Sequence, residues 1–302
     1  MSKFKAWLSA ARLRTLPLSV SGILVGTGMA NALGFYNPLV FLLAVLTTIG
    51  FQITSNFAND YGDGVKGTDN DDRIGPQRAL QSGALSRIEL KRGIGWSVAI
   101  SFLLVIALLY IAFGEDHLGY IAIFIILGAA SLWAAIRYTV GEGAYGYRGL
   151  GDVFVFIFFG LLSVLGTMFL YTKFLNLDAI LPAVTVGLLS TAVLNLNNLR
   201  DHDSDKKVGK NTLVVLLGVK RAKQYHYLLL ILALLSMLVY ILVRFEVWHN
   251  ALCLFAFIPI LIHLRTVYRI KDPILLDPEL KKLALSTFLL ALFFYIGYNN
   301  FL

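Results

Sequence analysis

The stretch VFLLAVLTTIGFQITSNFANDYGD, residues 40–63, passes from an apolar run directly into asparagine and aspartate. Its apolar part belongs to a segment at about residues 37–59, long enough for a helix to cross a bilayer core roughly 30 Å thick. Charged side chains are costly at the bilayer centre, so carboxylates directly after such a segment are expected at its edge. The pattern predicts a membrane-spanning helix that ends in a polar site.

Apolar segments of this kind recur along the whole chain. The chain has 302 residues, of which 58% are hydrophobic and 15% charged, whereas soluble domains carry about 25% charged residues. We therefore expect an all-α polytopic membrane protein, a single integral-membrane domain over residues 1–302, with about nine transmembrane helices in one bundle. The expected spans are 15–34, 37–59, 93–113, 118–138, 150–171, 177–199, 225–244, 247–268 and 283–301.

The basic residues lie in alternate loops. If the spans alternate, 24 of the 26 Lys and Arg residues fall on one side, and only Lys173 and Arg244 fall on the other. The positive-inside rule then predicts a cytoplasmic N-terminus and a C-terminus outside, in the inner (cytoplasmic) membrane. The net charge of +8 reflects this topology and indicates no nucleic-acid partner.

Two expected spans end in similar acidic motifs. Asparagine and aspartate residues three or four positions apart are expected to share one helix face. The two spans are four apart, an even number, so both motifs face the same side, as in a parallel internal repeat. The residues are Asn56, Asn59, Asp60 and Asp63 after the second span, and Asn197, Asp201 and Asp205 after the sixth.

Carboxylates gathered in this way repel one another unless a cation lies among them. Mg²⁺ suits oxygen ligands and is usually held by one or two carboxylates together with substrate phosphates. Basic residues between the motifs would bind those phosphates. The cluster therefore indicates a diphosphate site, whereas an ion pump would need carboxylates within the spans, which are nearly free of them. The basic residues are Lys66, Arg73, Arg78, Lys206, Lys207 and Lys210.

The motifs resemble those of the UbiA-type superfamily of intramembrane prenyltransferases, and within it the dihydroxynaphthoate polyprenyltransferases of menaquinone synthesis. Asn59, Asp60 and Asp63 match an N-D-x-x-D motif, and Asp201 and Asp205 match a D-x-x-x-D motif. Longer matches to the naphthoate branch are RLRTLPLS at 12–19, NFANDYGDGVKGTDNDDRIGPQR at 56–78 and YGYRGLGDVFVFIFFG at 145–160.

The resemblance implies transfer of a polyprenyl group from polyprenyl diphosphate to 1,4-dihydroxy-2-naphthoate, with decarboxylation, giving demethylmenaquinone after oxidation. It implies Mg²⁺ as cofactor, a lipid bilayer around the protein, and catalytic cytoplasmic loops at 60–92, 138–150 and 200–223. The implied catalytic residues are Asp60, Asp63, Asp201 and Asp205, and the metal ligands are Asn59, Asp63, Asn197, Asp201 and Asp205. Diphosphate binding is expected of Lys66, Arg73, Arg78, Lys206 and Lys210, and aromatic substrate binding of Arg14, Arg137 and Tyr138.

The chain departs from the superfamily at one motif position. Gly67 stands where a further aspartate is usual, and Asp69 follows two residues later, so the sequence leaves open whether Asp69 takes that role. Phe154, Phe156, Phe158 and Phe159 are either a path for the prenyl tail or packing residues that face other helices or lipid.

Two alternatives to this function stand beside it. A non-catalytic transporter of a phosphorylated lipid would use the same acidic and basic helix ends without releasing diphosphate. A prenyltransferase of the same superfamily with another acceptor, such as hydroxybenzoate, homogentisate or haem, would share both motifs.

Overall fold

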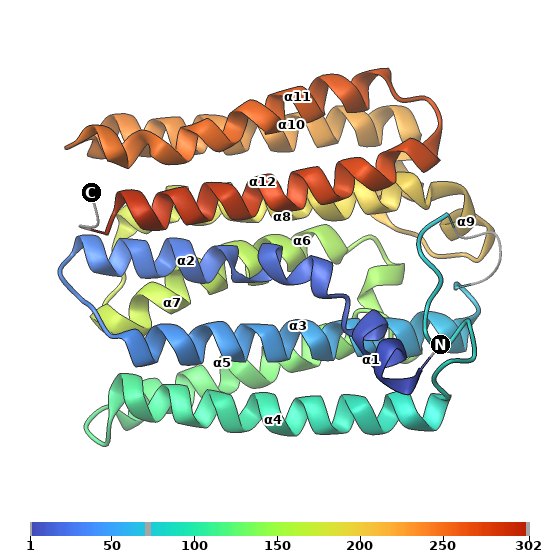
Figure 1. The fold of residues 1–302 in the computed structure, drawn as a ribbon, viewed down its shortest axis with the longest axis horizontal. Coiled ribbons are helices and arrows are strands. Elements are labelled where there is room, and N and C mark those ends of the chain that lie inside the picture. Colours follow the sequence, from blue (N-terminus) through green and yellow to red (C-terminus); the bar gives the residue numbers. More distant parts are fainter. Residues whose placement is uncertain (1, 70–73, 300–302) are drawn as a thin grey trace.

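The structure is a computed structural model, and it describes residues 2–69 and 74–299. These residues form long helices that run side by side (Figure 1), and the described ranges contain no strand, only an isolated bridge between Arg148 and Asn211. The helices are α1 (Lys3–Ala11), α2 (Leu16–Ala32), α3 (Pro38–Lys66), α4 (Arg87–Phe113), α5 (Leu118–Arg137), α6 (Gly151–Val155), α7 (Ser163–Thr172), α8 (Ile180–Arg200), α9 (His202–Lys207), α10 (Leu213–Arg244), α11 (Phe257–Arg269) and α12 (Leu276–Gly297). A π-helical segment, Phe156–Leu162, joins α6 to α7, and a 3₁₀ segment, Trp248–Ala256, precedes α11.

The chain is a multi-pass membrane protein. Within the described ranges, eight helical segments have at least 18 residues and are apolar enough to cross a bilayer. α2 has 17 residues and lies among them as a ninth (Figure 1). The predicted all-α bundle is confirmed, and its predicted number of about nine helices agrees with this arrangement.

Several helices begin or continue outside the apolar stretches that identified them. α3 begins where Asn37 Oδ1 accepts bonds from the backbone N–H groups of Leu39 and Val40, and it runs on through the acidic motif to Lys66. α4 begins at a capping box between Ser86 and Glu89, several residues before the expected span. Caps of this kind satisfy the first N–H groups of a helix, so helices start at them and not at the membrane edge.

α8 lies at the centre of the bundle, where it packs against α10, α12 and the π-helical segment. Small residues bring the backbones together, since a Cβ atom on Gly160 would lie 2.5 Å from the Cα atom of Gly187. α2 packs against α12 and α7, so the first and last spans of the chain are neighbours. The packing of distant segments leaves a pocket among α2, α3, α5, α6 and α8.

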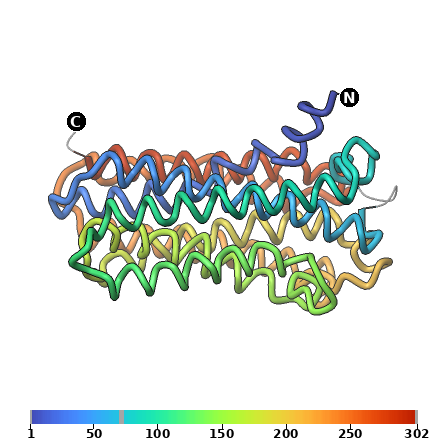
Figure 2. Tube along the Cα trace, turned by 90° about the horizontal axis from the view of Figure 1, so that it is seen from below, coloured from blue at the N-terminus to red at the C-terminus, as the bar shows by residue number. Residues whose placement is uncertain are grey.

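The two acidic motifs lie at the same end of the bundle. α3 ends there, α8 ends there beside α9, and α12 begins there (Figure 1). α1 and the loop near residue 80 lie at this end too, as the turned view in Figure 2 shows. The polar loops of the chain therefore surround one mouth of the helix bundle.

Candidate active site

The first acidic motif occupies the last two turns of α3. Asn59 and Asp63 are four residues apart, and both line one internal cavity. α3 stops at Gly67, whose φ of 72° is the left-handed conformation that glycine adopts easily. The turn that follows brings Asp69 to the wall of the same cavity. Gly67, which stands at the place of the further aspartate in the motif that the sequence resembles, thus ends the helix.

The other two polar residues of this helix end lie away from the cavity. Asn56 donates to the carbonyl oxygen of Ala11 at 2.8 Å, and the fully buried Asp60 accepts a bond from the backbone N–H of Ala79 at 3.2 Å. The four positions share one helix face as predicted, but only Asn59 and Asp63 line the cavity. At about 100° per residue they spread over about 100° of the helix, and one half of that arc contacts α1 and the loop near Ala79 instead.

The second acidic motif follows a bend and not a continuous helix. α8 ends at Arg200, Asp201 is its C-terminal cap with φ −94° and ψ 9°, and Asp205 lies on the short helix α9. Despite the bend, Asn197, Asp201 and Asp205 all line the cavity that holds the first motif. The structure therefore brings the two motifs to one site from opposite walls.

Lys210 lies between the two motifs. Its Nζ atom is 3.7 Å from Oδ2 of Asp63 and 3.8 Å from Oδ1 of Asp205, and its side chain is 12% exposed. Burial alone would lower the pKa of this ammonium group, but the charges of Asp63 and Asp205 outweigh burial and raise its pKa. The ammonium stays charged and keeps two facing carboxylates together.

Tyr147 supports Asp63 from the loop between α5 and α6. Its hydroxyl donates to Oδ1 of Asp63 at 2.7 Å, and the hydroxyl of Thr68 lies 2.5 Å from the same phenol oxygen. Burial and the nearby charge of Asp63 raise the pKa of the Tyr147 hydroxyl, so it remains a donor. The Nζ atom of Lys66 lies 3.9 Å from the centroid of the Tyr147 ring, a cation–π contact.

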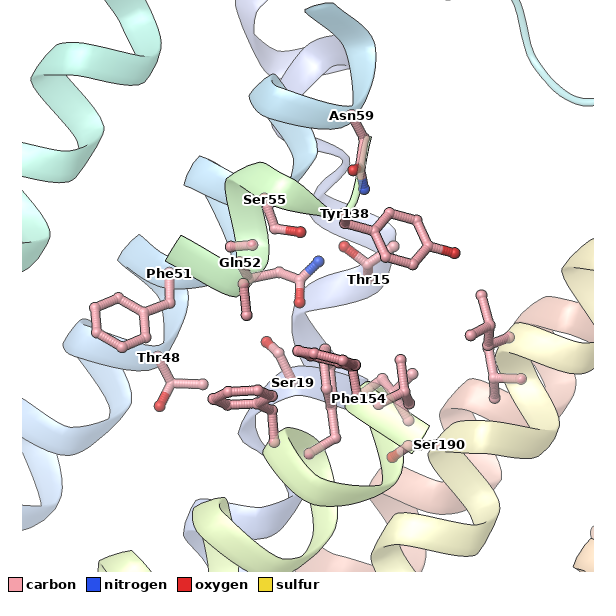
Figure 3. A pocket seen from close by; sticks show the side chains of 18 of the residues that line it. Thr15, Ser19, Thr48, Phe51, Gln52, Ser55, Asn59, Tyr138, Phe154 and Ser190 are labelled. Carbon is pink, nitrogen blue, oxygen red and sulfur yellow. The ribbon is translucent and has the colours of Figure 1, made fainter. Parts of the chain in front are cut away.

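The cavity has a volume of about 570 Å³ and changes character along its length. In Figure 3, Asn59 and Tyr138 lie at one end of the pocket, and Gln52 and Ser55 follow along α3. Farther in, apolar side chains dominate, among them Phe51 and Phe154. A cavity with charged groups at its mouth and apolar walls behind suits a ligand with an anionic head and a hydrocarbon tail.

The predicted binding residues divide into two groups. Arg14, Arg78 and Tyr138 line the cavity, and Arg78 Nε lies 4.0 Å from Oδ1 of Asp69. Of the residues that the structure describes, Lys66, Arg137 and Lys206 do not line it, and neither does Asp60. Lys206 is exposed on α9, and Arg73 lies outside the described residues. The charged loop residues nearest in sequence to a motif are therefore not always nearest in space.

Three of the four phenylalanines near residue 156 line the cavity. Phe154 and Phe158 lie with ring centroids 6.0 Å apart, and Phe159 follows directly. Phe156 instead packs beside Gly187 of α8. Phe158 and Phe159, consecutive residues of the π-helical segment, both line the cavity.

Several cavity residues were missed at the sequence level. Arg12 and Thr15 come from the short link between α1 and α2, on either side of the predicted Arg14, and Arg12 has a left-handed φ of 50°. A non-glycine residue with positive φ is uncommon and often marks a functional site, but the sequence gives no signal of it. Asp277 and Lys281 line the cavity from α12, outside every motif.

Comparison with known proteins agrees with the motifs. The sequence profile described as the UbiA prenyltransferase family matches residues 19–280. A 1,4-dihydroxy-2-naphthoate octaprenyltransferase from Escherichia coli (strain K12) is 45% identical over 300 residues, which cover 98% of this chain and 96% of that protein. A protein of the same description from Mycobacterium tuberculosis (strain ATCC 25618 / H37Rv) is 39% identical over 237 residues, 77% of each chain.

Solved structures share the fold. A UbiA homolog from Archaeoglobus fulgidus bound to GPP and Mg²⁺ superposes with a TM-score of 0.68 at 14% identity, covering 97% of this chain and 99% of that one. The apo structure of a UbiA homolog from Aeropyrum pernix K1 has a TM-score of 0.67 at 18% identity, covering 91% and 97%. At these identities the similarity concerns the arrangement of the helices.

Proposed function

The chain belongs to the UbiA prenyltransferase family, and from that premise we propose that it transfers a polyprenyl group from polyprenyl diphosphate to 1,4-dihydroxy-2-naphthoate. The ring carbon that bears the carboxylate forms the new bond to the prenyl carbon, diphosphate and CO₂ leave, and oxidation of the product gives demethylmenaquinone. The observation that carries this proposal is the meeting of both aspartate motifs at the mouth of one cavity, in a chain 45% identical to a dihydroxynaphthoate octaprenyltransferase.

The residues at this mouth fit Mg²⁺. Asparagine and aspartate supply hard oxygen donors, namely Asn59, Asp63, Asn197, Asp201 and Asp205, and Asp69 adds another carboxylate. Among the described residues, no three His, Cys, Asp or Glu side chains form a cage that would hold a metal alone. Mg²⁺ held by few carboxylates together with substrate phosphate oxygens is consistent with this geometry. When bound, Mg²⁺ would neutralise charge that develops on the leaving diphosphate.

The basic residues on the cavity wall have different expected roles from those outside it. Lys210 and Arg78 lie beside the carboxylates and would donate to diphosphate oxygens, with Lys210 held in place by Asp63 and Asp205. Arg14 and Tyr138 line the same mouth and would orient the acceptor acid. Lys66, Arg137 and Lys206 lie outside the cavity wall, so we assign them no direct contact.

The apolar walls of the cavity protect the reactive cation and hold the prenyl chain. An allylic cation that forms when diphosphate leaves must be kept from water and close to the acceptor ring. The apolar part of the cavity, with Phe154 and Phe158 on one wall, excludes water and receives the prenyl chain. The polar mouth and the apolar interior thus match the two ends of a polyprenyl diphosphate.

We further place the mouth on the cytoplasmic face of the inner membrane. The loops at 60–92, 138–150 and 200–223 carry the motif residues and many of the basic residues, which supports this orientation by the positive-inside rule. Labelling of single cysteines placed at Lys207 and Glu115 in intact and permeabilised cells tests it. A residue 207 cysteine that reacts with an impermeant reagent in intact cells contradicts the orientation.

A direct assay tests the proposed function. Purified protein with Mg²⁺, a polyprenyl diphosphate and dihydroxynaphthoate should release diphosphate and form a prenylated, decarboxylated naphthalene product that mass spectrometry identifies. Parallel reactions with hydroxybenzoate and homogentisate should form no product. Movement of the prenyl lipid between vesicles without diphosphate release would favour a transporter instead.

A further inference from the structure

Arg200 is the last residue of α8, and its side chain is 1% exposed. Its Nε and Nη2 atoms bind the two carboxylate oxygens of Asp201 at 2.8 and 2.7 Å, and Nη2 also donates to Oδ1 of Asn197 at 3.0 Å. Two residues of the second motif are therefore held by one guanidinium group. A two-point bond fixes the plane of a carboxylate as well as its position.

The remaining side of Arg200 binds a residue of the last helix. Nη1 donates to Oδ1 of Asp277 at 2.5 Å, and Asp277 lies in the first turn of α12. This helix begins after the last loop at this end of the bundle, which carries neither aspartate motif. Asp277 also lines the cavity, with its side chain 36% exposed.

α12 is held in place from its other side. Glu279 is buried, and its Oε2 atom lies 2.7 Å from Nδ1 of His263 on α11. Nε2 of His263 lies 3.1 Å from Nε2 of His226 on α10. These buried contacts join α10, α11 and α12 close to the first turn of α12. They hold the helix backbone at Asp277 in place, so Asp277 can bind Arg200 from a fixed position.

We propose that Asp277 is a positioning residue for the metal and diphosphate site. By binding Nη1 of Arg200, it keeps the guanidinium in the orientation that presents Asp201 and Asn197 to the cavity. Without this anchor, Asp201 alone would compensate the buried charge of Arg200, and the guanidinium, no longer held through Nη1, would shift and carry the Asp201 carboxylate and the Asn197 amide out of their positions on the cavity wall. This inference rests on the proposed function and adds the last helix to the site.

The test compares two matched substitutions. Asp277→Asn removes the carboxylate that binds Arg200, whereas Asp272→Asn removes a carboxylate from the same loop whose Oδ1 only accepts a bond from the backbone N–H of Ile274. Asparagine accepts the same bond, so Asp272→Asn controls for the loss of one negative charge near the mouth. Asp277→Glu keeps a carboxylate at this position, so it tests whether a carboxylate is enough for normal metal binding and turnover.

The first readout is metal binding without turnover. Electron paramagnetic resonance would measure Mn²⁺ binding in the presence of geranyl thiolodiphosphate, whose bridging sulfur suppresses ionisation. Asp277→Asn should raise the half-saturating Mn²⁺ concentration about tenfold, the lower end of the effect of losing an outer-shell partner. Asp272→Asn should match the wild type, and Asp277→Glu should recover most of the loss.

The second readout is steady-state turnover. Asp277→Asn should lower kcat while the KM for dihydroxynaphthoate stays unchanged, because the change acts on the metal and diphosphate end. Mn²⁺ binding and kcat equal to those of Asp272→Asn would overturn the inference, as would a lower melting temperature with unchanged Mn²⁺ affinity. If the wild-type protein forms no product, the proposed function is wrong. The Mn²⁺ measurement still tests the role of Asp277 in that case.

Discussion

The Nζ atom of Lys210 lies 3.7 Å from Oδ2 of Asp63, so the loop after α9 is joined to the end of α3. The same atom lies 3.8 Å from Oδ1 of Asp205. A protein cation therefore occupies the space between the two motifs that were expected to share a metal. This arrangement lets the two carboxylates face each other across one ammonium group.

Lys210→Met should change metal and diphosphate binding in opposite directions. The two carboxylates lose their internal cation, so Mn²⁺ binding without diphosphate should strengthen, while diphosphate binding weakens because a donor is lost. Turnover should fall about 10²–10³-fold, as when one donor to a developing charge is removed. Isothermal titration with Mn²⁺ and with inorganic diphosphate measures both. The control is Lys220→Met, because Lys220 is exposed and lies outside the cavity wall. If Lys210→Met weakened the binding of both Mn²⁺ and diphosphate, the prediction would be contradicted.

Asp63→Ala and Asp205→Ala should each reduce turnover at least 10²–10³-fold, and the double variant should fall little further. The reason is that both carboxylates serve one diphosphate, and residues that act as a unit are strongly non-additive. Single-turnover rates of diphosphate release measure the effect, with monodisperse elution as the control for folding. Losses that multiply in the double variant would indicate two independent sites.

Turnover should require a divalent cation. EDTA should abolish product formation, and added Mg²⁺ should restore it, because Lys210 and Arg78, already beside carboxylates, cannot by themselves neutralise the charge that a diphosphate brings to the site. The melting temperature without substrate should not change with EDTA, because among the described residues no three His, Cys, Asp or Glu side chains form a group that would hold a metal alone. Full turnover in chelator would reject the metal assignment.

Substitution of Asp60 should lower the stability of the protein, whereas substitution of Asp69 should lower turnover. Asp60→Ala leaves the buried backbone N–H of Ala79 without its carboxylate partner, which should cost about 1–3 kcal/mol in the free energy of unfolding. Asp69→Asn keeps a polar side chain on the cavity wall, so it should lower turnover with little change in melting temperature. Thermal melts and turnover assays of both variants decide this. A stable but inactive Asp60→Ala would place Asp60 in the catalytic site after all.

The sequence predicted the parts of this structure that depend on local patterns. Apolar segments located the spans, and the spacing of Asn59 and Asp63 placed both on the cavity side of α3. The same spacing argument also placed Asp60 on this face, but it could not show that Asp60 lies outside the cavity, because the choice between two sides of a helix end depends on what packs there. That partner is the backbone of Ala79, which no periodicity specifies.

Contacts between distant segments could not be predicted. Tyr147 bonds to Asp63 and Arg200 bonds to Asp277 only because α3 and α8 end, and α12 begins, at one level of the bundle. No motif marks these pairs, and one sequence contains no information on which loops meet. The bend at Asp201 was missed for a related reason, since helix propensity does not show where a short cap replaces the next turn.

The contact between α2 and α12 has a consequence for how the protein is made. Most residues of α2 are buried, and Gly28 meets α12, since a Cβ atom there would lie 3.3 Å from Cδ1 of Phe294. A ribosome inserts α2 long before it has synthesised α12, so this face of α2 must wait in the membrane without its final neighbour. Assembly can finish only when the last helix arrives, and that helix also delivers Asp277 to the site. A nascent chain released at residue 275 should therefore remain bound to insertion factors or be degraded, which pulse-chase labelling of the truncated chain would show by a half-life shorter than that of the full chain.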